Sequence, residues 1–305
     1  MKRTIFLLIT LMTLTSCFST LPDDPGLDPS GGVGGGTGEF ISDYSTSVWE
    51  YLPAPGQFIG ETGTGMEHIT STEIACEYAR QRLSNQAYVS LGGFGGFIVV
   101  GFAKDIANTE GHDFSVTSNQ TSTSSEPGIV WVMRDENDND RPDDTWYELK
   151  GSQYGKDDYQ KDYAVTYYRD LEIKEGADIT WEDSDGNKGV IKYLKEFHDQ
   201  GSYFPQWLNT DSYTLRGSRL KQDVKYNTAT KMWEFPNYEW GYADNYESAH
   251  TINRIFFDIS NAVDSKGKSV ALTTISWVKI QSAVNAQAGE CGEVSTEICS
   301  VKIEN

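Results

Sequence analysis

Residues 128–149 decide the fold, because they read as two strands joined by an acidic loop. The stretch is Gly128-Ile-Val-Trp-Val-Met133, then Arg134-Asp-Glu-Asn-Asp-Asn-Asp-Arg-Pro-Asp-Asp144, then Thr145-Trp-Tyr-Glu-Leu149. β-Branched and aromatic residues dominate both ends, and such residues favour strands. The middle carries Pro, Asn and Asp, which mark turns and loops. The acidic run therefore predicts a connection between two strands of one sheet protein.

The rest of the chain follows the same pattern of short apolar stretches separated by turn residues. One helix is predicted after the capping box Thr70-Ser-Thr-Glu73, with an end near Asn85. Further strands are predicted at 87–91, 97–102, 113–117, 163–168, 179–182, 188–193, 212–215, 252–259, 275–280 and near Val301. Many short strands with one helix predict an all-β fold: an antiparallel β-sandwich of jelly-roll type with one short N-terminal helix.

The N-terminal residues predict export and a lipid anchor. Lys2 and Arg3 precede a short apolar run that closes at Leu14-Thr-Ser-Cys17, which is similar to a bacterial lipobox. We expect a signal peptide over 1–16, lipidation of Cys17, a Gly- and Pro-rich tether over 17–40 and a single β-sandwich domain over 41–305. The predicted location is the outer membrane, with the protein exposed at the cell surface. The alternative is a signal peptide with an incidental cysteine.

Charge and cysteine content limit the classes of partner. The chain has 25 Lys and Arg against 45 Asp and Glu, a formal charge of −20, which argues against nucleic acid as a partner. Cys291 and Cys299 lie eight residues apart, so a hairpin in an oxidising compartment would allow a disulfide between them. Cys76 falls on the predicted helix and is interpreted as a small buried hydrophobic residue.

The acidic loop predicts a structural calcium site, since calcium takes oxygen ligands at alternating loop positions. The predicted ligands are Asp135, Asn137, Asn139, the carbonyl of Arg141, Asp143 and Asp144. Two features depart from known calcium loops: Asp140 stands where glycine makes the sharp turn, and Trp146 stands at the twelfth position. A solvated acidic turn is the alternative.

Asp113 and Glu126 flank a Ser- and Thr-rich loop over 117–125. Each is a candidate to close a metal site or to face a ligand, with an ordinary turn residue as the alternative.

Aromatic residues gather in two Pro-containing segments that we predict to be loops. Exposed aromatic rings there would form a flat platform for sugars or other ring-bearing ligands. The predicted ligand-binding residues are Tyr203, Phe204, Trp207, Trp233, Tyr238, Trp240 and Tyr242. The alternative is that these rings plug the open end of the sandwich. No nucleophile, zinc or phosphate-binding motif is found, so no catalytic residue is predicted.

Several motifs together resemble a family of Bacteroidota cell-surface lipoproteins with a jelly-roll-like domain. The resemblance covers roughly residues 48–303, and its motifs lie at 91–102, 126–133, 143–151, 258–264, 278–284 and 292–297. It implies an accessory role in nutrient uptake through a TonB-dependent transporter, in some members for corrinoids. The expected function is a non-enzymatic binding module for a corrinoid or a glycan. A surface polysaccharide hydrolase and a structural or adhesive protein are the alternatives.

Overall fold

The computed structural model describes residues 42–305 except 174, 222, 236 and 248–252. The predicted signal peptide, the lipidation site Cys17 and the tether lie outside the described residues. From Ile41 onward the chain forms one compact unit. Among the helices described there, none has both the length and the apolar character needed to span a membrane.

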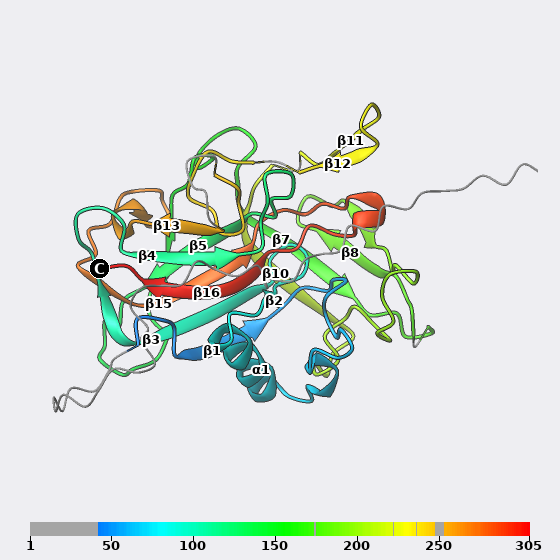
Figure 1. Ribbon diagram of the computed structural model, residues 1–305, viewed down its shortest axis with the longest axis horizontal. Coiled ribbons are helices and arrows are strands. Elements are labelled where there is room, and N and C mark those ends of the chain that lie inside the picture. Colours follow the sequence, from blue (N-terminus) through cyan, green and yellow to red (C-terminus); the bar gives the residue numbers. More distant parts are fainter. Residues whose placement is uncertain (1–41, 174, 222, 236, 248–252) are drawn as a thin grey trace, which may run out of the picture. The chain divides into compact units, whose positions relative to one another are not determined.

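Two antiparallel sheets form a sandwich, as Figure 1 shows. The six-stranded sheet has the order β1 (Ser47–Leu52), β3 (Phe97–Ala107), β15 (Thr274–Ser282), β5 (Gly128–Met133), β6 (Tyr147–Leu149) and β14 (Ala262–Val263). The four-stranded sheet has the order β13 (Arg254–Phe257), β4 (Phe114–Ser118), β16 (Glu297–Ile303) and β2 (Val89–Ser90). The chain alternates between these sheets from β3 to β4 to β5, and again from β13 to β15 to β16. This crossing gives the expected all-β sandwich of jelly-roll type.

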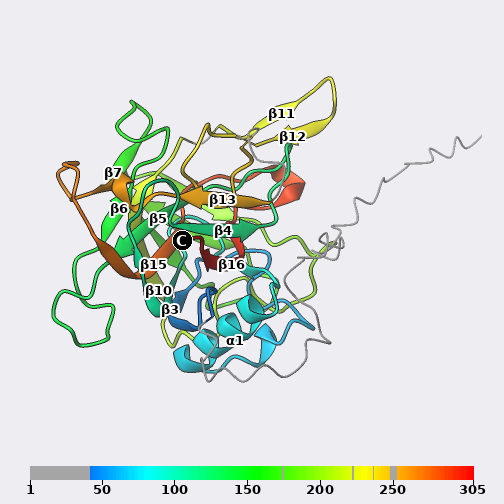
Figure 2. The ribbon, with the colours of Figure 1, turned by 60° about the vertical axis from the view of Figure 1, so that its left-hand side comes forward.

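A second four-stranded sheet and a small hairpin complete the strands that the structure describes. The sheet has the order β10 (Ser212–Arg219), β7 (Gln160–Tyr168), β8 (Ile179–Asp183) and β9 (Lys188–Ile191). The hairpin pairs β11 (Lys225–Asn227) with β12 (Met232–Glu234) and projects from the body (Figure 2). The helices are α1 (Thr72–Ser84) and the short 3₁₀ turns η1 (Met66–His68), η2 (Ile259–Asn261) and η3 (Gly289–Cys291).

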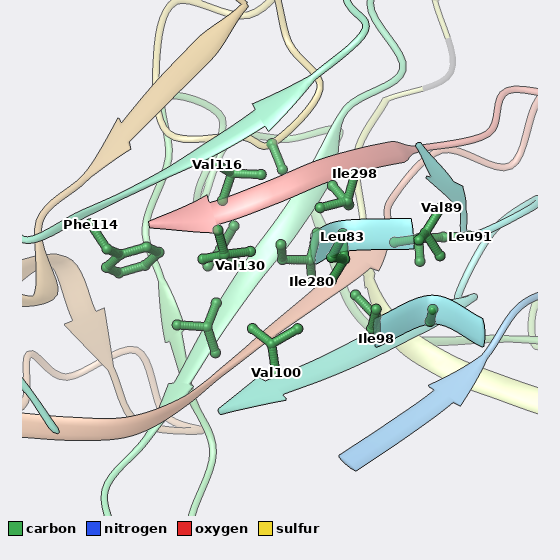
Figure 3. Packing of buried hydrophobic residues seen from close by; sticks show 14 of the residues in the cluster. Leu83, Val89, Leu91, Ile98, Val100, Phe114, Val116, Val130, Ile280 and Ile298 are labelled. Atoms are coloured by element: carbon green, nitrogen blue, oxygen red, sulfur yellow. The ribbon is translucent and has the colours of Figure 1, made fainter. Parts of the chain in front are cut away.

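The main core lies between the two sandwich sheets, and Figure 3 shows its packing. Ile280 of β15 stands opposite Ile98 of β3 on one side and Val130 of β5 on the other. Across the sandwich, Val116 of β4 and Ile298 of β16 belong to the same cluster of buried residues. Strand alternation explains this arrangement, because every second side chain of each strand points to the same face.

Helix α1 closes one end of the core. It begins one residue later than predicted. Its N-cap is Ser71, not Thr70, and the Ser71 hydroxyl accepts the N–H of Ile74. Ala75, Ala79 and Leu83 are buried at helical spacing, whereas Ile74 is exposed.

The glycine-rich run before β3 is required by a close approach of three backbone segments. A Cβ at Gly96 would lie 1.8 Å from the carbonyl oxygen of Leu91. A Cβ at Gly92, whose φ is +66°, would lie 2.0 Å from the carbonyl oxygen of Ala54. Only glycine fits such contacts.

We expect Ile280→Ala to lower the free energy of unfolding by about 2–5 kcal/mol, because it removes buried methyl groups and leaves a cavity. The matched control is Ile173→Ala, the same change at an isoleucine with 53% of its surface exposed. Urea denaturation of the two variants measures both effects. Equal losses in the two variants would contradict the core assignment.

Candidate functional site

The acidic loop between β5 and β6 is held together by its own side chains. The Asp135 carboxylate accepts the backbone N–H groups of Asn139, at 3.2 Å, and Asp140, at 2.8 Å. The Asn139 amide donates to both carboxylate oxygens of Asp143, at 3.1 Å each. The Arg141 N–H donates to the Asn139 side-chain oxygen at 2.8 Å. The predicted ligand residues therefore meet within one ordered loop.

The two departures from known calcium loops have different consequences. Asp140 has a φ of +55°, the left-handed conformation that glycine usually supplies and aspartate tolerates, so the sharp turn forms without glycine. Trp146 is half-buried and packs beside Met133 and Trp277, so it offers no ligand. Asp144 instead lies at the loop, where it accepts the Asn137 side-chain amide at 3.2 Å. Calcium at this loop stays a prediction.

We expect calcium to raise the melting temperature and Asp135→Asn to reduce that gain, because the variant removes one carboxylate ligand of the loop. Asp138→Asn is the matched control: it removes the same charge from the loop at a residue outside the alternating ligand set, and asparagine tolerates its φ of +55°. Thermal denaturation with calcium and with chelator measures both variants. If calcium stabilises both variants as it stabilises the unsubstituted protein, the loop is a solvated turn.

Five of the seven aromatic side chains predicted to form a ligand platform are buried. They are Tyr203, Phe204, Trp207, Tyr238 and Tyr242. Tyr203 and Phe204 pack in a second core against β7, β8 and β10. The exposed-platform prediction is wrong for these five, because the Pro-containing segments fold back over the sheets and their rings fill apolar gaps there.

The two remaining aromatic residues do not form a platform either. Trp233 lies in β12, where a loop was predicted, and its ring is half-buried beside Tyr226. Trp240 is exposed and lies on the segment that follows.

The predicted disulfide between Cys291 and Cys299 is not formed. Cys291 is exposed in η3, at the tip of a turn, whereas Cys299 is buried in β16. The chain runs away from that turn through the antiparallel bridge of Gln287 with Glu293 and then along β16. Because an extended chain advances about 3.3 Å per residue, the two thiols are carried apart.

Asp113 and Glu126 have different surroundings. Asp113 is fully buried, and its carboxylate accepts the N–H groups of Thr109, at 2.7 Å, and Ile259, at 2.8 Å. It therefore ties β4 to neighbouring segments and faces no ligand. Glu126 belongs to a cluster of carboxylates described below.

A cavity of about 270 Å³ opens beside the sheet formed by β7, β8 and β9. Strand register creates it: Tyr167 of β7 stands opposite Trp181 of β8, and Trp181 stands opposite Gly189 of β9. The Trp181 ring lies across Gly189, since a Cβ there would meet the ring at 2.2 Å. The row formed by Tyr167 and Trp181 thus ends at Gly189, which has no side chain, at the edge of the sheet.

The segment 285–293 forms the other wall of the cavity and contributes polar groups. Asn285, Gln287 and Glu293 line it. The Gln287 amide lies against the edge of β9, and in the amide orientation that satisfies both of its groups it donates to the Val190 carbonyl at 2.7 Å and accepts the Lys192 N–H at 3.1 Å. Aromatic and polar linings are thus combined around one cavity, as in sites for small polar ligands.

Glu293 is the buried acid of this cavity. Its Oε1 accepts the N–H of Gln57 at 2.8 Å, whereas its buried Oε2 has no hydrogen-bond donor in the part of the chain that is described. Burial raises the pKa of the Glu293 carboxyl to about 7. A carboxyl with an unused oxygen can accept one more hydrogen bond, or donate one when it is protonated.

Three further carboxylates meet next to this segment. Glu126, Asp244 and Glu297 each place an oxygen within 4.8 Å of the others. Burial and the neighbouring charges of Glu297 and Asp244 raise the pKa of Glu126. Burial raises the pKa of Glu297 to about 7, against the hydrogen bonds of Ser295 and Ser90.

The sequence carries a signal for each of the two sites. The hairpin turn around Asp185-Gly186 fixes the register that places Trp181 opposite Gly189. In Glu293-Val-Ser-Thr-Glu297, the two acids lie four residues apart and so share one face of an extended segment.

The chain matches no protein-family model, and a search of curated proteins found no similar sequence. The site geometry alone therefore supports the function proposed below.

We expect the protein to lose stability as pH rises from 5 to 8, in part through Glu293. Its folded-state pKa of about 7 lies above the value of about 4.3 in an unfolded chain, so the folded state holds the proton more tightly. The resulting stability is complete below about pH 4 and is lost as pH rises through 7. Glu293→Gln should flatten part of the slope of melting temperature against pH. Glu172→Gln, at an exposed glutamate, is the control, and equal slopes for both variants would exclude Glu293 as the source.

Proposed function

We propose that this protein is a non-enzymatic binding module that captures a small hydroxylated ligand, a single sugar residue of a glycan, in the cavity beside β8 and β9. The observation that carries the proposal is the combination of Trp181 and Tyr167 with the buried acid Glu293 around one space of about 270 Å³. A sugar ring stacks its C–H face on an aromatic ring, and its hydroxyl groups pair with carboxyl and amide groups. Asn285 and Gln287 provide such amides.

The size of the cavity favours a sugar over a corrinoid, the two ligands expected from the sequence. Sites for drug-sized ligands occupy about 300–1,000 Å³, and this cavity lies just below that range. A corrin macrocycle with its side chains is far larger than one sugar ring. Attachment through Cys17 to the outer membrane and delivery to a TonB-dependent transporter complete the proposal, and both follow from the predicted anchor and the family resemblance.

The geometry favours binding over glycoside hydrolysis. Glycosidases of the common type use two carboxyl groups about 5–10 Å apart across the scissile bond. Among the described residues that line the cavity, Glu293 is the only acid. A purely structural role is supported by the buried aromatics, but it gives no reason for a cavity lined by Trp181 and Glu293.

Tryptophan fluorescence titration with a panel of monosaccharides and short glycans tests the proposal. We expect Trp181→Ala to weaken binding about 5- to 30-fold, because it removes the stacking surface. Trp240→Ala is the control, since Trp240 is exposed but does not line the cavity. Glu293→Gln should weaken binding above pH 7, where the unsubstituted carboxylate is the stronger acceptor.

Cobalamin is titrated in parallel with the sugars. A response to cobalamin and to no sugar would replace the sugar proposal with the corrinoid one. A response to neither ligand, or equal losses in Trp181→Ala and Trp240→Ala, would remove the cavity as the binding site.

A further inference from the structure

The cluster of Glu126, Asp244 and Glu297 has the dimensions of a metal site. Calcium binds oxygen ligands at about 2.3–2.6 Å, so oxygens on opposite sides of one ion lie up to about 5 Å apart. One carboxylate oxygen from each of the three acids lies within 4.8 Å of the other two. One ion at the centre of the cluster is therefore within reach of all three carboxylates.

Backbone contacts hold the three acids in place independently of any ion. The segment before β5 pairs with the loop that holds Asp244, since the Glu126 N–H donates to the Asp244 carbonyl at 2.9 Å. The Ser295 N–H donates to Glu126 Oε1 at 3.0 Å, and the Glu297 N–H donates to Asp244 Oδ2 at 2.8 Å. Asp244 adopts a φ of +52° in this arrangement. The acids come from three separate segments that the fold fixes at one point.

A buried oxygen of Glu297 independently indicates that the cluster lacks a partner group. The residue is 1% exposed, and its Oε1 accepts the hydroxyl groups of Ser295, at 2.6 Å, and Ser90, at 3.1 Å. Its Oε2 is buried and has no hydrogen bond of good geometry from any described residue. The side chains of Asn119, which can donate, and Glu126, which can donate only when it is protonated, both approach the Glu297 carboxylate. A buried carboxylate oxygen without a donor is costly, and either a proton or a cation would satisfy it.

The charge around the cluster favours a cation. Within the described residues, neither Glu126 nor Glu297 forms an ion pair with a lysine or arginine. The buried acid Glu293 adds a further negative charge nearby when it is ionised. Glu126 is partly exposed, whereas the other two acids are buried, so an ion can enter from the Glu126 side.

We infer that Glu126, Asp244 and Glu297 bind one hard divalent cation, with calcium as the preferred ion. The ligands are all oxygens, which suits Ca²⁺ and Mn²⁺ and disfavours metals that prefer sulfur or imidazole. The ion neutralises the buried acids and locks the start of β16 to the loop around Asp244 and to the segment before β5. This site is separate from the acidic loop at 135–144 and from the sugar cavity.

Titration calorimetry with Ca²⁺ and Mn²⁺ tests the inference in the full chain carrying Asp135→Asn, which removes the loop as a source of binding. We expect one equivalent to bind with release of protons, measured in two buffers of different ionisation enthalpy. Adding Glu297→Gln or Glu126→Gln should weaken binding about 100-fold, because each removes one charged ligand. Glu148→Gln is the control, a buried glutamate of β6 whose carboxylate accepts Ser218 instead.

Two results would overturn the inference: no cation bound by the Asp135→Asn protein, or equal binding by the Glu126→Gln and Glu148→Gln variants. If no cation binds, a proton shared between the carboxyl groups is what holds the acids together. Glu126 is partly exposed, so its variant keeps the test decisive if Glu297→Gln fails to fold. In crystals soaked with Mn²⁺, the anomalous signal should lie between the three carboxylates. Sugar binding is measured separately, so its failure would leave this result unaffected.

Discussion

Alternation of side chains along residues 293–303 is the constraint on which the rest of the structure depends. Before the irregularity between Ile298 and Ser300, the even-numbered residues Val294, Thr296 and Ile298 face one side, and the acids at 293 and 297 face the other. After that bulge the phase changes, so Val301 and Ile303 enter the core. One segment thus supplies the sandwich core, the acid of the cavity and the acid of the buried cluster.

Buried carboxyl groups make this arrangement costly unless they are paired or protonated. Burial shifts the pKa of Glu293, Glu297 and Glu247 to about 7 in each case. Fixed hydrogen bonds from Ser90 and Ser295 offset part of that cost at Glu297. A fold that buries such carboxyl groups is less stable than one without them. Functional sites commonly contain buried groups with shifted pKa values.

The sequence predicted local structure well and the candidate site poorly. Strands such as β5 and β15, and the helix after Ser71, were predicted because strand alternation and capping are local properties. Helix α1 begins one residue late because both Thr70 and Ser71 are able to cap it. Strand β1 was missed because its pairing with β3 involves residues far apart in the chain.

The burial of Tyr203 and Phe204 was missed for the same reason, since it depends on where the segment folds and not on its composition. Glu126, Asp244 and Glu297 come from three distant segments, so no spacing in the sequence joins them. By contrast, the loop at 135–144 was noticed early because all of its acids are close in sequence.

The contact of Gln287 with β9 has a consequence for how copies of this protein meet one another. An edge strand with unpaired backbone groups is a template on which a second chain can add a strand. The Gln287 amide occupies the Val190 carbonyl and the Lys192 N–H, and so imitates a missing neighbour at that edge. The wall of the cavity therefore also occupies two backbone groups that a strand from another molecule would need in order to extend the sheet at β9.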